Sequence, residues 1–298
     1  MRVAFHLARR ALPEYSGRFS RHDFSLPQLF ACLVVREMLG LSYRRAEALL
    51  ADCPDWLTAV GLTRAPDHNT LCRANAWLLR SCRVRRLLDA MARLAARVRM
   101  LRLSTRPLAV DASHYEDRHV SRYFEFRRGR GGGRRGRRAK VKSMPKLSVA
   151  VASGCHLVLS AVARTGCGSD HPDYEPLVLS AWARVPHRRF RVVADAGYDG
   201  EHHHRVLRQD MGLASVVPPT IGRPTTKPPG GCWRRHMARL LRTKAGRRRC
   251  GYTQRWQVET VNSMMKRNQG SALRGKTSKS RERDLLMKVL AHNVMVLR

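Results

Sequence analysis

The chain has 298 residues, 43% of them hydrophobic, which is enough to bury one large core or two modest ones. Its 58 lysines and arginines against 22 acidic residues give a formal net charge of +36. Such an excess opposes compaction and is tolerated when a polyanion binds. Nucleic acid is the favoured partner, because neutralised phosphates release counterions. An anionic membrane surface is the weaker alternative, since no lipidation signal or long amphipathic segment accompanies the charge.

The apolar segments near the N-terminus predict neither a membrane span nor a signal peptide. The longest of them, residues 29–35, is too short to cross a bilayer, and Arg9 and Arg10 interrupt the residues before it. We therefore expect no membrane association and a cytoplasmic protein, associated with the nucleoid if the cell is bacterial. The eight cysteines form no Cys-x-x-Cys pair, which argues against a zinc ribbon.

Residues 1–105 are predicted to form an all-α region of helix-turn-helix type that binds DNA. Apolar residues at helical spacing predict helices over residues 26–39, 45–50 and 70–79, and a long basic helix over residues 80–102. Residues that favour helix ends accompany the first three: Gly40, Ser42, and Asp67 or Asn69. Short helices in this order resemble a helix-turn-helix. The pattern alone is weak, because small helical subdomains that never contact DNA share it.

From residue 106 the periodicity becomes that of an α/β fold. Strands are predicted over residues 107–111, 146–152, 156–163, 190–195 and 214–217. Helices are predicted over residues 174–183, 252–265 and 283–297, with a loop over residues 218–235. This order is compatible with a ribonuclease-H-like fold, so we predict a catalytic domain over residues 106–298.

Residues 127–146 form a basic, low-complexity segment with ten basic side chains, three consecutive glycines and no carboxylate. Such a segment cannot bury a core and is predicted to be a flexible loop between the first two strands. We expect it to follow the DNA backbone, with contacts from Arg134, Arg135, Arg137 and Arg138. An insertion that is merely disordered is the alternative.

Two aspartates stand out in a chain with few acidic residues. Asp111 and Asp195 are each predicted to end a β-rich strand, where a parallel sheet presents its functional groups. Asp199 lies in a Gly-Tyr-Asp-Gly sequence and is interpreted as a turn residue.

A third acidic residue lies on the predicted C-terminal helix. Tyr252, Arg255, Glu259, Asn262 and Lys266 are separated by three, four, three and four residues, which places them in one stripe. A glutamate between an arginine and a lysine is not a core pattern. A solvent-exposed series of ion pairs is the ordinary alternative for such spacing.

Three clustered carboxylates repel one another unless a cation neutralises them. We therefore expect Asp111, Asp195 and Glu259 to hold Mg²⁺ or Mn²⁺, which prefer oxygen ligands. Two such ions, about 3.5–4 Å apart, would activate an attacking oxygen and stabilise the leaving one. Arg255 and Lys266 would then bind the phosphates on either side of the scissile one.

The spacing Tyr252-x2-Arg255-x3-Glu259-x6-Lys266 resembles the Y-R-E-K signature of DDE insertion-sequence transposases, the group that contains the fourth and fifth insertion-sequence families. Three further segments are similar to parts of these enzymes. Residues 108–111 resemble the strand with the first catalytic aspartate, residues 193–199 the stretch with the second, and residues 66–71 part of the DNA-binding region.

The resemblance implies a ribonuclease-H-like catalytic domain that uses divalent metal. Water would attack each transposon end and release a 3′-OH, which would attack target DNA without a covalent protein intermediate. Such enzymes act on paired terminal inverted repeats, so the expected partners are double-stranded DNA and a second copy of the chain. The sequence leaves open whether the reaction passes through a hairpin intermediate. Only about thirty residues separate the last predicted strand from Tyr252, which is within the ordinary range for a loop and a short helix. Trp233 could stack on a base or anchor this loop.

Two other functions share parts of this pattern. A nuclease of the same fold would use the same carboxylates but would not join DNA ends. A non-catalytic, basic DNA-binding protein derived from a decayed transposase would explain the charge but not the aligned acidic residues.

Overall fold

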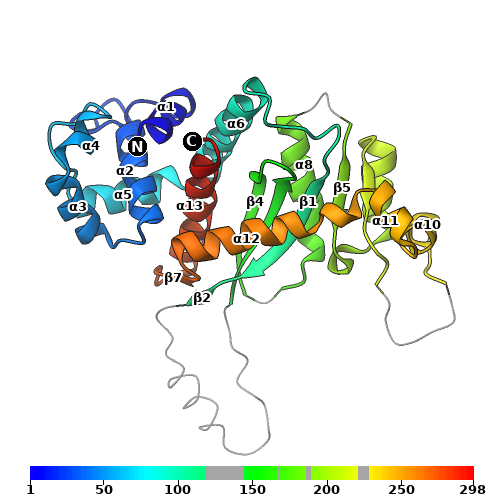
Figure 1. Cartoon of the computed structure of the whole chain (residues 1–298). Helices are drawn as coiled ribbons and strands as arrows, with labels where there is room; N and C mark the ends of the chain where they lie inside the picture. The colour runs from blue at the N-terminus through cyan, green and yellow to red at the C-terminus, as the bar shows by residue number, and fades with distance from the viewer. Residues whose placement is uncertain (118–143, 167, 186–188, 221–227) are drawn as a thin grey trace, which may run out of the picture.

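The computed structural model describes residues 1–117, 144–166, 168–185, 189–220 and 228–298. A group of N-terminal helices lies on one side of the C-terminal helix, and a mixed sheet with its own helices lies on the other (Figure 1). Most of the predicted basic segment, with Arg134, Arg135, Arg137 and Arg138, falls outside the described residues. Its last residue does not: Lys146 is a fully buried residue of a strand.

The helices before residue 105 are α1 (Arg2–Ala11), α2 (Leu26–Met38), α3 (Tyr43–Asp52), α4 (Pro54–Thr58), α5 (His68–Leu78) and α6 (Ser81–Arg97). Ser25 begins α2 with a reciprocal capping box to Gln28, and Asp67 caps α5 through the backbone N–H of Asn69. The predicted basic helix ends earlier than residue 102, because the chain turns at Arg99, whose φ is 58°.

The main sheet has the strand order β4-β3-β1-β5-β6. Its strands are β1 (Leu108–His114), β3 (Pro145–Ala152), β4 (Leu157–Thr165), β5 (Arg191–Ala194) and β6 (Ala214–Val216). β3 pairs antiparallel with both β1 and β4, whereas β1, β5 and β6 are parallel to one another. A separate two-stranded parallel sheet joins β2 (Glu116–Asp117) to β7 (Ala272–Leu273). All five strands predicted for the main sheet are therefore present.

The remaining helices are α8 (Tyr174–Arg184), α9 (Glu201–Arg205), α10 (Cys232–Leu240), α11 (Lys244–Arg249), α12 (Trp256–Gln269) and α13 (Ser278–Val296). Short helical turns are η1 (His171–Asp173), η2 (Ala196–Tyr198), η3 (Val206–Asp210) and η4 (Tyr252–Gln254). The predicted loop over residues 218–235 is too long at its end, since α10 begins at Cys232. Among the described residues, no helix is both long and apolar enough to pass through a membrane.

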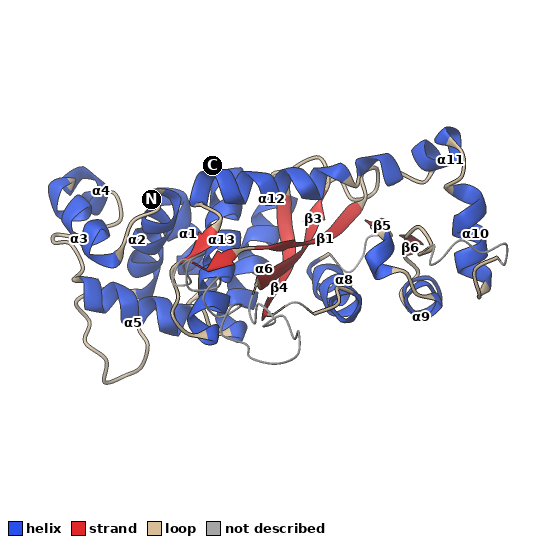
Figure 2. Ribbon diagram, turned by 90° about the horizontal axis from the view of Figure 1, so that it is seen from below, coloured by secondary structure: helices blue, strands red, loops and turns tan. Residues whose placement is uncertain are grey.

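The sheet is covered on both faces, and α12 and α8 lie on opposite sides of it (Figure 2). Successive residues of a strand point to opposite faces. Ala109 and Val193 accordingly belong to the core under α12, whereas Val110 and Val192 belong to the core under α8. Burial on both faces explains why the strands contain nearly continuous apolar runs.

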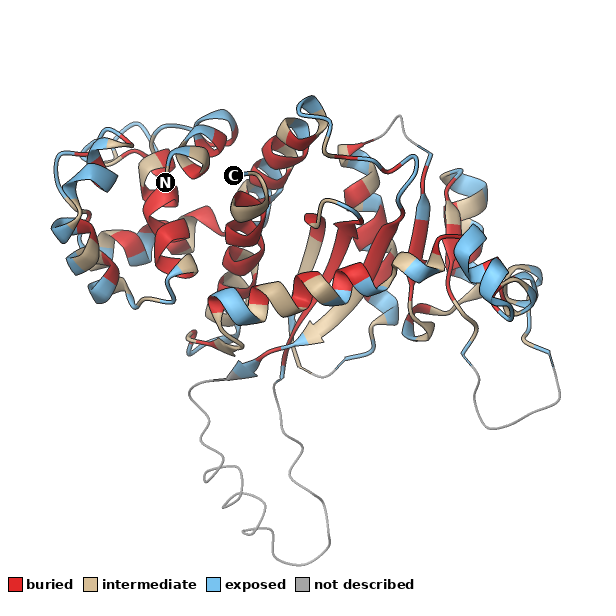
Figure 3. Ribbon diagram, viewed as in Figure 1, coloured by how far each residue is buried: buried red, intermediate tan, exposed pale blue. Residues whose placement is uncertain are grey.

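The C-terminal helix α13 joins the N-terminal helices to the sheet. It packs against α2, α5 and α6 and against the edge strand β4, and it is buried along most of its length (Figure 3). At that edge the amide of Asn293 accepts from the backbone N–H of Val158 at 2.9 Å and donates to the carbonyl oxygen of Val158 at 2.8 Å. One hydrophobic core therefore runs from α1 and α2 through α13 to the sheet.

Candidate active site

Asp111 and Asp195 lie where the parallel pairing of β1 and β5 ends. The last paired residues are Val110 and Ala194, so each aspartate is the next residue of its chain segment. The prediction that Asp111 ends its strand is wrong, because β1 continues to His114 by pairing with β3 alone. Asp195 does follow the last residue of β5. The two carboxylates are thus brought to the same edge of the sheet, as the sequence predicts.

Asp195 is held by the turn that follows it. One of its carboxylate oxygens accepts a hydrogen bond from the backbone N–H of Gly197 at 2.9 Å and so caps η2. A side chain at residue 197 would be crowded, since a Cβ there would lie 3.1 Å from this carboxylate oxygen. The glycine therefore allows the close approach of backbone and carboxylate.

The five residues of the predicted stripe do not all lie on one regular helix. Tyr252 lies in the turn η4, and the regular helix α12 begins only after Arg255. The Arg255 guanidinium forms an ion pair with Glu259 one turn later. Further along the helix, the side-chain amide of Asn262 donates to Asp111 at 3.2 Å. The Lys266 ammonium nitrogen lies 5.3 Å from the centre of the Tyr115 ring.

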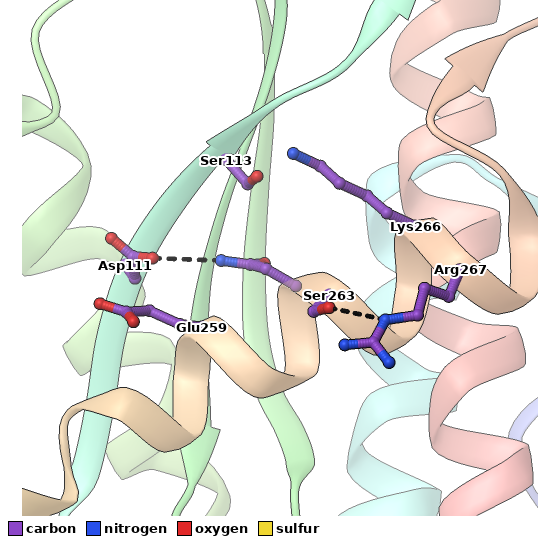
Figure 4. Close-up of a pocket in the computed structure, with 7 residues that line it drawn as sticks. Asp111, Ser113, Glu259, Ser263, Lys266 and Arg267 are labelled. Carbon is purple, nitrogen blue, oxygen red and sulfur yellow. Dashed lines mark hydrogen bonds between the residues drawn. The ribbon is translucent and has the colours of Figure 1, made fainter.

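An open cavity of about 420 Å³ lies between β1 and α12. Its lining residues are Asp111, Ser113, Glu259, Asn262, Ser263, Lys266 and Arg267. Asp111 and Glu259 both face the cavity, and Lys266 extends toward Ser113 (Figure 4). Two carboxylates and two cations thus line one hollow, which suits a ligand that combines a metal ion with phosphate groups.

The charges in the site act on one another. The pKa of Asp111 is raised to about 6, mainly by burial and in part by the negative charges of Asp195 and Glu259. The backbone N–H of Ala112 and the guanidinium of Arg255 act in the opposite direction. A carboxylate in this position is costly to ionise without a cation nearby, so the arrangement favours a cation between the three acidic groups.

The residues fit a divalent metal ion by the chemistry of their donors. Asp111 and Glu259 supply carboxylate oxygens to the cavity, whereas Asp195 lies beside Asp111 at the end of the β1–β5 pairing and does not line it. A buried amide oxygen of Asn262 has no hydrogen-bond partner among the described residues. Hard oxygen donors of this kind suit Mg²⁺ and Mn²⁺.

Within the described part of the chain, three ligand atoms lie within 4.8 Å of one another only in the group Glu47, Asp67 and His68. The three predicted carboxylates are therefore further apart than that. The N-terminal group is explained by helix packing, because the backbone N–H of His68 donates to Glu47 at 3.1 Å and its ring Nδ1 lies 2.8 Å from the same oxygen. Asp67 caps α5 in the same contact region.

A model of the family described as "Transposase DDE domain" matches residues 104–294. The chain belongs to this family. The match begins just before β1 and ends within α13, so it contains the sheet, the cavity and all three predicted carboxylates. Membership of the transposase DDE family implies an enzyme of the transposase or nuclease type that acts on DNA, and such enzymes typically use divalent metal. A search of curated proteins gives no match.

Several contacts of the family's domain in this chain were not predicted from the sequence. The sequence pattern places Asn262 in the stripe but indicates no role for it. Its contact with Asp111 joins residues 151 positions apart. Asp199, interpreted as a turn residue, accepts a forked contact from Arg234. Trp233 lies under Arg208, whose guanidinium carbon is 4.5 Å from the ring centre. A sequence pattern identifies such residues only as polar or aromatic, since their partners come from distant segments.

Proposed function

We propose that the protein is a DNA transposase of the Y-R-E-K type, with a ribonuclease-H-like catalytic domain over residues 106–298. The observation that carries the proposal is the cavity that Asp111 shares with Glu259, with Asp195 placed beside Asp111 at the end of the β1–β5 pairing, all inside the residues that match the family. The strand and helix order, with an antiparallel hairpin followed by parallel strands, supports the assignment of the fold.

Asp111, Asp195 and Glu259 would hold Mg²⁺ or Mn²⁺, with two ions in each site. When bound, the ions activate an attacking oxygen and stabilise the leaving oxygen of a phosphodiester. Arg255 would hold the Glu259 carboxylate in place through their ion pair. Lys266 and Arg267, which line the same cavity, would bind the phosphates beside the scissile one.

The proposed reaction is cleavage at the transposon ends followed by strand transfer into target DNA. The partners are double-stranded DNA with terminal inverted repeats and a second copy of this chain, which together form the synaptic complex. Residues 1–105 would supply DNA recognition, with α3 and α5 in a helix-turn-helix-like arrangement fixed by the Glu47 and His68 contact. Arg134, Arg135, Arg137 and Arg138 would contact the DNA backbone, and Tyr252 would lie beside the scissile phosphate. Such a protein would act in the cytoplasm, at the nucleoid in a bacterium.

The test is strand cleavage and joining on labelled DNA that carries the element's own ends, with Mg²⁺ or with EDTA. Wild-type protein should release a 3′-OH and form joined products only with the metal, and Asp195→Asn should do neither while still binding DNA. Cleavage without joining would favour a nuclease of the same fold. Tight DNA binding without cleavage in the presence of Mg²⁺ would favour the non-catalytic DNA-binding protein derived from a decayed transposase.

A further inference from the structure

Asn262 is the most deeply buried polar residue of the cavity wall. It is 6% exposed and lies on α12 three residues after Glu259, so the two side chains leave the same face of the helix. Both residues line the cavity together with Asp111. A buried amide in such a place needs partners for both its N–H groups and its oxygen.

Only one end of this amide has a partner. The nitrogen donates to Asp111 at 3.2 Å, whereas the amide oxygen is buried without a hydrogen-bond partner among the residues that the structure describes. An unsatisfied buried acceptor costs on the order of 1–3 kcal/mol. Asp111 and Glu259 of the same wall can only accept, and the donors that line the cavity, Ser113, Ser263, Lys266 and Arg267, make no hydrogen bond to this oxygen.

The two ends of an asparagine amide have nearly the same shape and can exchange places by rotation of the side chain. Without a cation, the nitrogen faces Asp111 because an amide oxygen there would be repelled by the carboxylate. With a cation between the two residues the preference reverses, since both oxygens are then attracted to it. A rotation of the Asn262 side chain is therefore enough to turn its amide oxygen toward a cation beside Asp111.

We propose that Asn262 is a further ligand of the divalent ion held by Asp111 and Glu259, with its amide oxygen turned toward the ion. The inference rests on the proposed function, because it assumes the metal site. A neutral oxygen ligand would complete the coordination without adding to the negative charge of three carboxylates. The competing role is that of a positioning residue, in which only the amide nitrogen acts by fixing Asp111.

Replacement by aspartate and by alanine distinguishes the two roles. Asn262→Asp keeps an oxygen in place of the amide but removes the nitrogen donor, whereas Asn262→Ala removes both. If Asn262 is a ligand, aspartate should support metal binding at least as well as asparagine. If it acts only as a donor to Asp111, aspartate should be as harmful as alanine, or worse, because it repels that carboxylate.

The experiment measures Mn²⁺ binding to the full chain without DNA, by the electron paramagnetic resonance signal of free Mn²⁺. Asn262→Ala should weaken binding by about 10-fold or more, and Asn262→Asp should bind as tightly as wild type or more tightly. Asn268, an exposed asparagine of the same helix, provides the matched control. Asn268→Ala and Asn268→Asp should both leave the affinity unchanged. Thermal unfolding of each variant in EDTA checks that it is folded.

Two results would overturn the inference. One is wild-type affinity in folded Asn262→Ala, and the other is binding by Asn262→Asp that is no stronger than that of Asn262→Ala. Asp111→Asn separates these from a failure of the proposed function. If wild type and Asp111→Asn bind Mn²⁺ equally poorly, the metal site itself is absent and both proposals fall. If Asp111→Asn loses binding while Asn262→Ala keeps it, only the role of Asn262 is rejected.

Discussion

Arg234 of α10 contacts both carboxylate oxygens of Asp199, with its Nε at 3.0 and 2.9 Å and its Nη2 at 2.6 Å from one of them. The Asp199 side chain is only 2% exposed. Glu201 adds a second connection by accepting from backbone N–H groups at the start of α10. Because Asp199 follows Asp195 by four residues, these contacts attach α10 to the segment that carries the second carboxylate of the site.

Replacing Arg234 by alanine should destabilise this segment. The substitution leaves the buried Asp199 carboxylate without its forked partner, and the loss of one member of a buried ion pair costs about 3 kcal/mol. We expect the free energy of unfolding in urea to fall by about that amount, and DNA cleavage to fall about 10-fold as Asp195 loses its support. Arg235→Ala, at an exposed position of the same helix, should change neither. Unchanged stability in Arg234→Ala would show that the contacts between Arg234 and Asp199 do not stabilise the segment that carries Asp195.

Lys266→Ala should weaken the binding of end DNA and make it less sensitive to salt. The ammonium group lines the cavity beside Asp111, where it is placed to neutralise one phosphate. Removing one such contact reduces the slope of the logarithm of the binding constant against the logarithm of salt concentration by about 1. Fluorescence anisotropy over a range of salt concentrations measures this slope. Lys266→Arg, which keeps the charge, should retain the wild-type slope, and an equal slope in the alanine variant would exclude a phosphate contact.

The strands of the main sheet could be predicted because both faces of the sheet are buried and the apolar runs of the strands are nearly continuous. The helix α1 was not predicted, although Ala4, Leu7, Ala8 and Ala11 repeat at helical spacing and are buried. Arg9 and Arg10 interrupt this apolar pattern, so the sequence indicates a charged segment and not a helix with one apolar face. The error at Asp111 has another cause, since the polar residues after it form a strand only because β3 pairs with them.

The stripe on α12 could be predicted because helical periodicity is a local property. The burial of Lys146 could not be predicted in this way. Lys146 is fully buried because Asp170 and Asp173 lie 2.9 and 3.4 Å from its ammonium nitrogen, and both are brought there by the fold. From the sequence alone, a lysine in a basic segment is expected to have a solvated side chain. The contacts among the site residues could not be predicted either, because these residues are far apart in the sequence and only the fold brings them together.

Lys288→Ala should be strongly destabilising, although Lys288 does not line the cavity of the candidate active site. Its ammonium group is buried between α2 and α13, where it donates to Glu37 at 3.1 Å and to the carbonyl oxygen of Gln269 at 2.7 Å. Truncation leaves the buried Glu37 carboxylate with a poorer partner in Arg36, 3.5 Å away. Unfolding in urea should show a loss of about 3–5 kcal/mol. A folded Lys288→Ala variant with wild-type stability would contradict this account.

His204 should make the protein less stable in mild acid. The imidazole is 1% exposed and its Nδ1 lies 2.6 Å from the hydroxyl oxygen of Ser215. The pKa of His204 is lowered to about 4, mainly by burial and in part by the positive charge of Arg208, against the opposing carboxylates of Asp199 and Glu201. The charge of His203 acts in the same direction as that of Arg208. The native state therefore keeps this histidine neutral at pH values where the unfolded chain binds a proton.

The sign of the effect follows from that difference in bound protons. The stabilisation is fully present above pH 6.5, the ordinary pKa of histidine, and is lost as the pH falls toward 4. The loss amounts to about 3 kcal/mol, since each unit of pKa corresponds to about 1.4 kcal/mol. Urea unfolding of wild type and His204→Gln at pH 7.5, 6 and 5 measures it. Glutamine can still bond Ser215 but does not titrate, so its stability should fall less between pH 7.5 and 5. Parallel losses in the two proteins would mean that other groups cause the acid sensitivity.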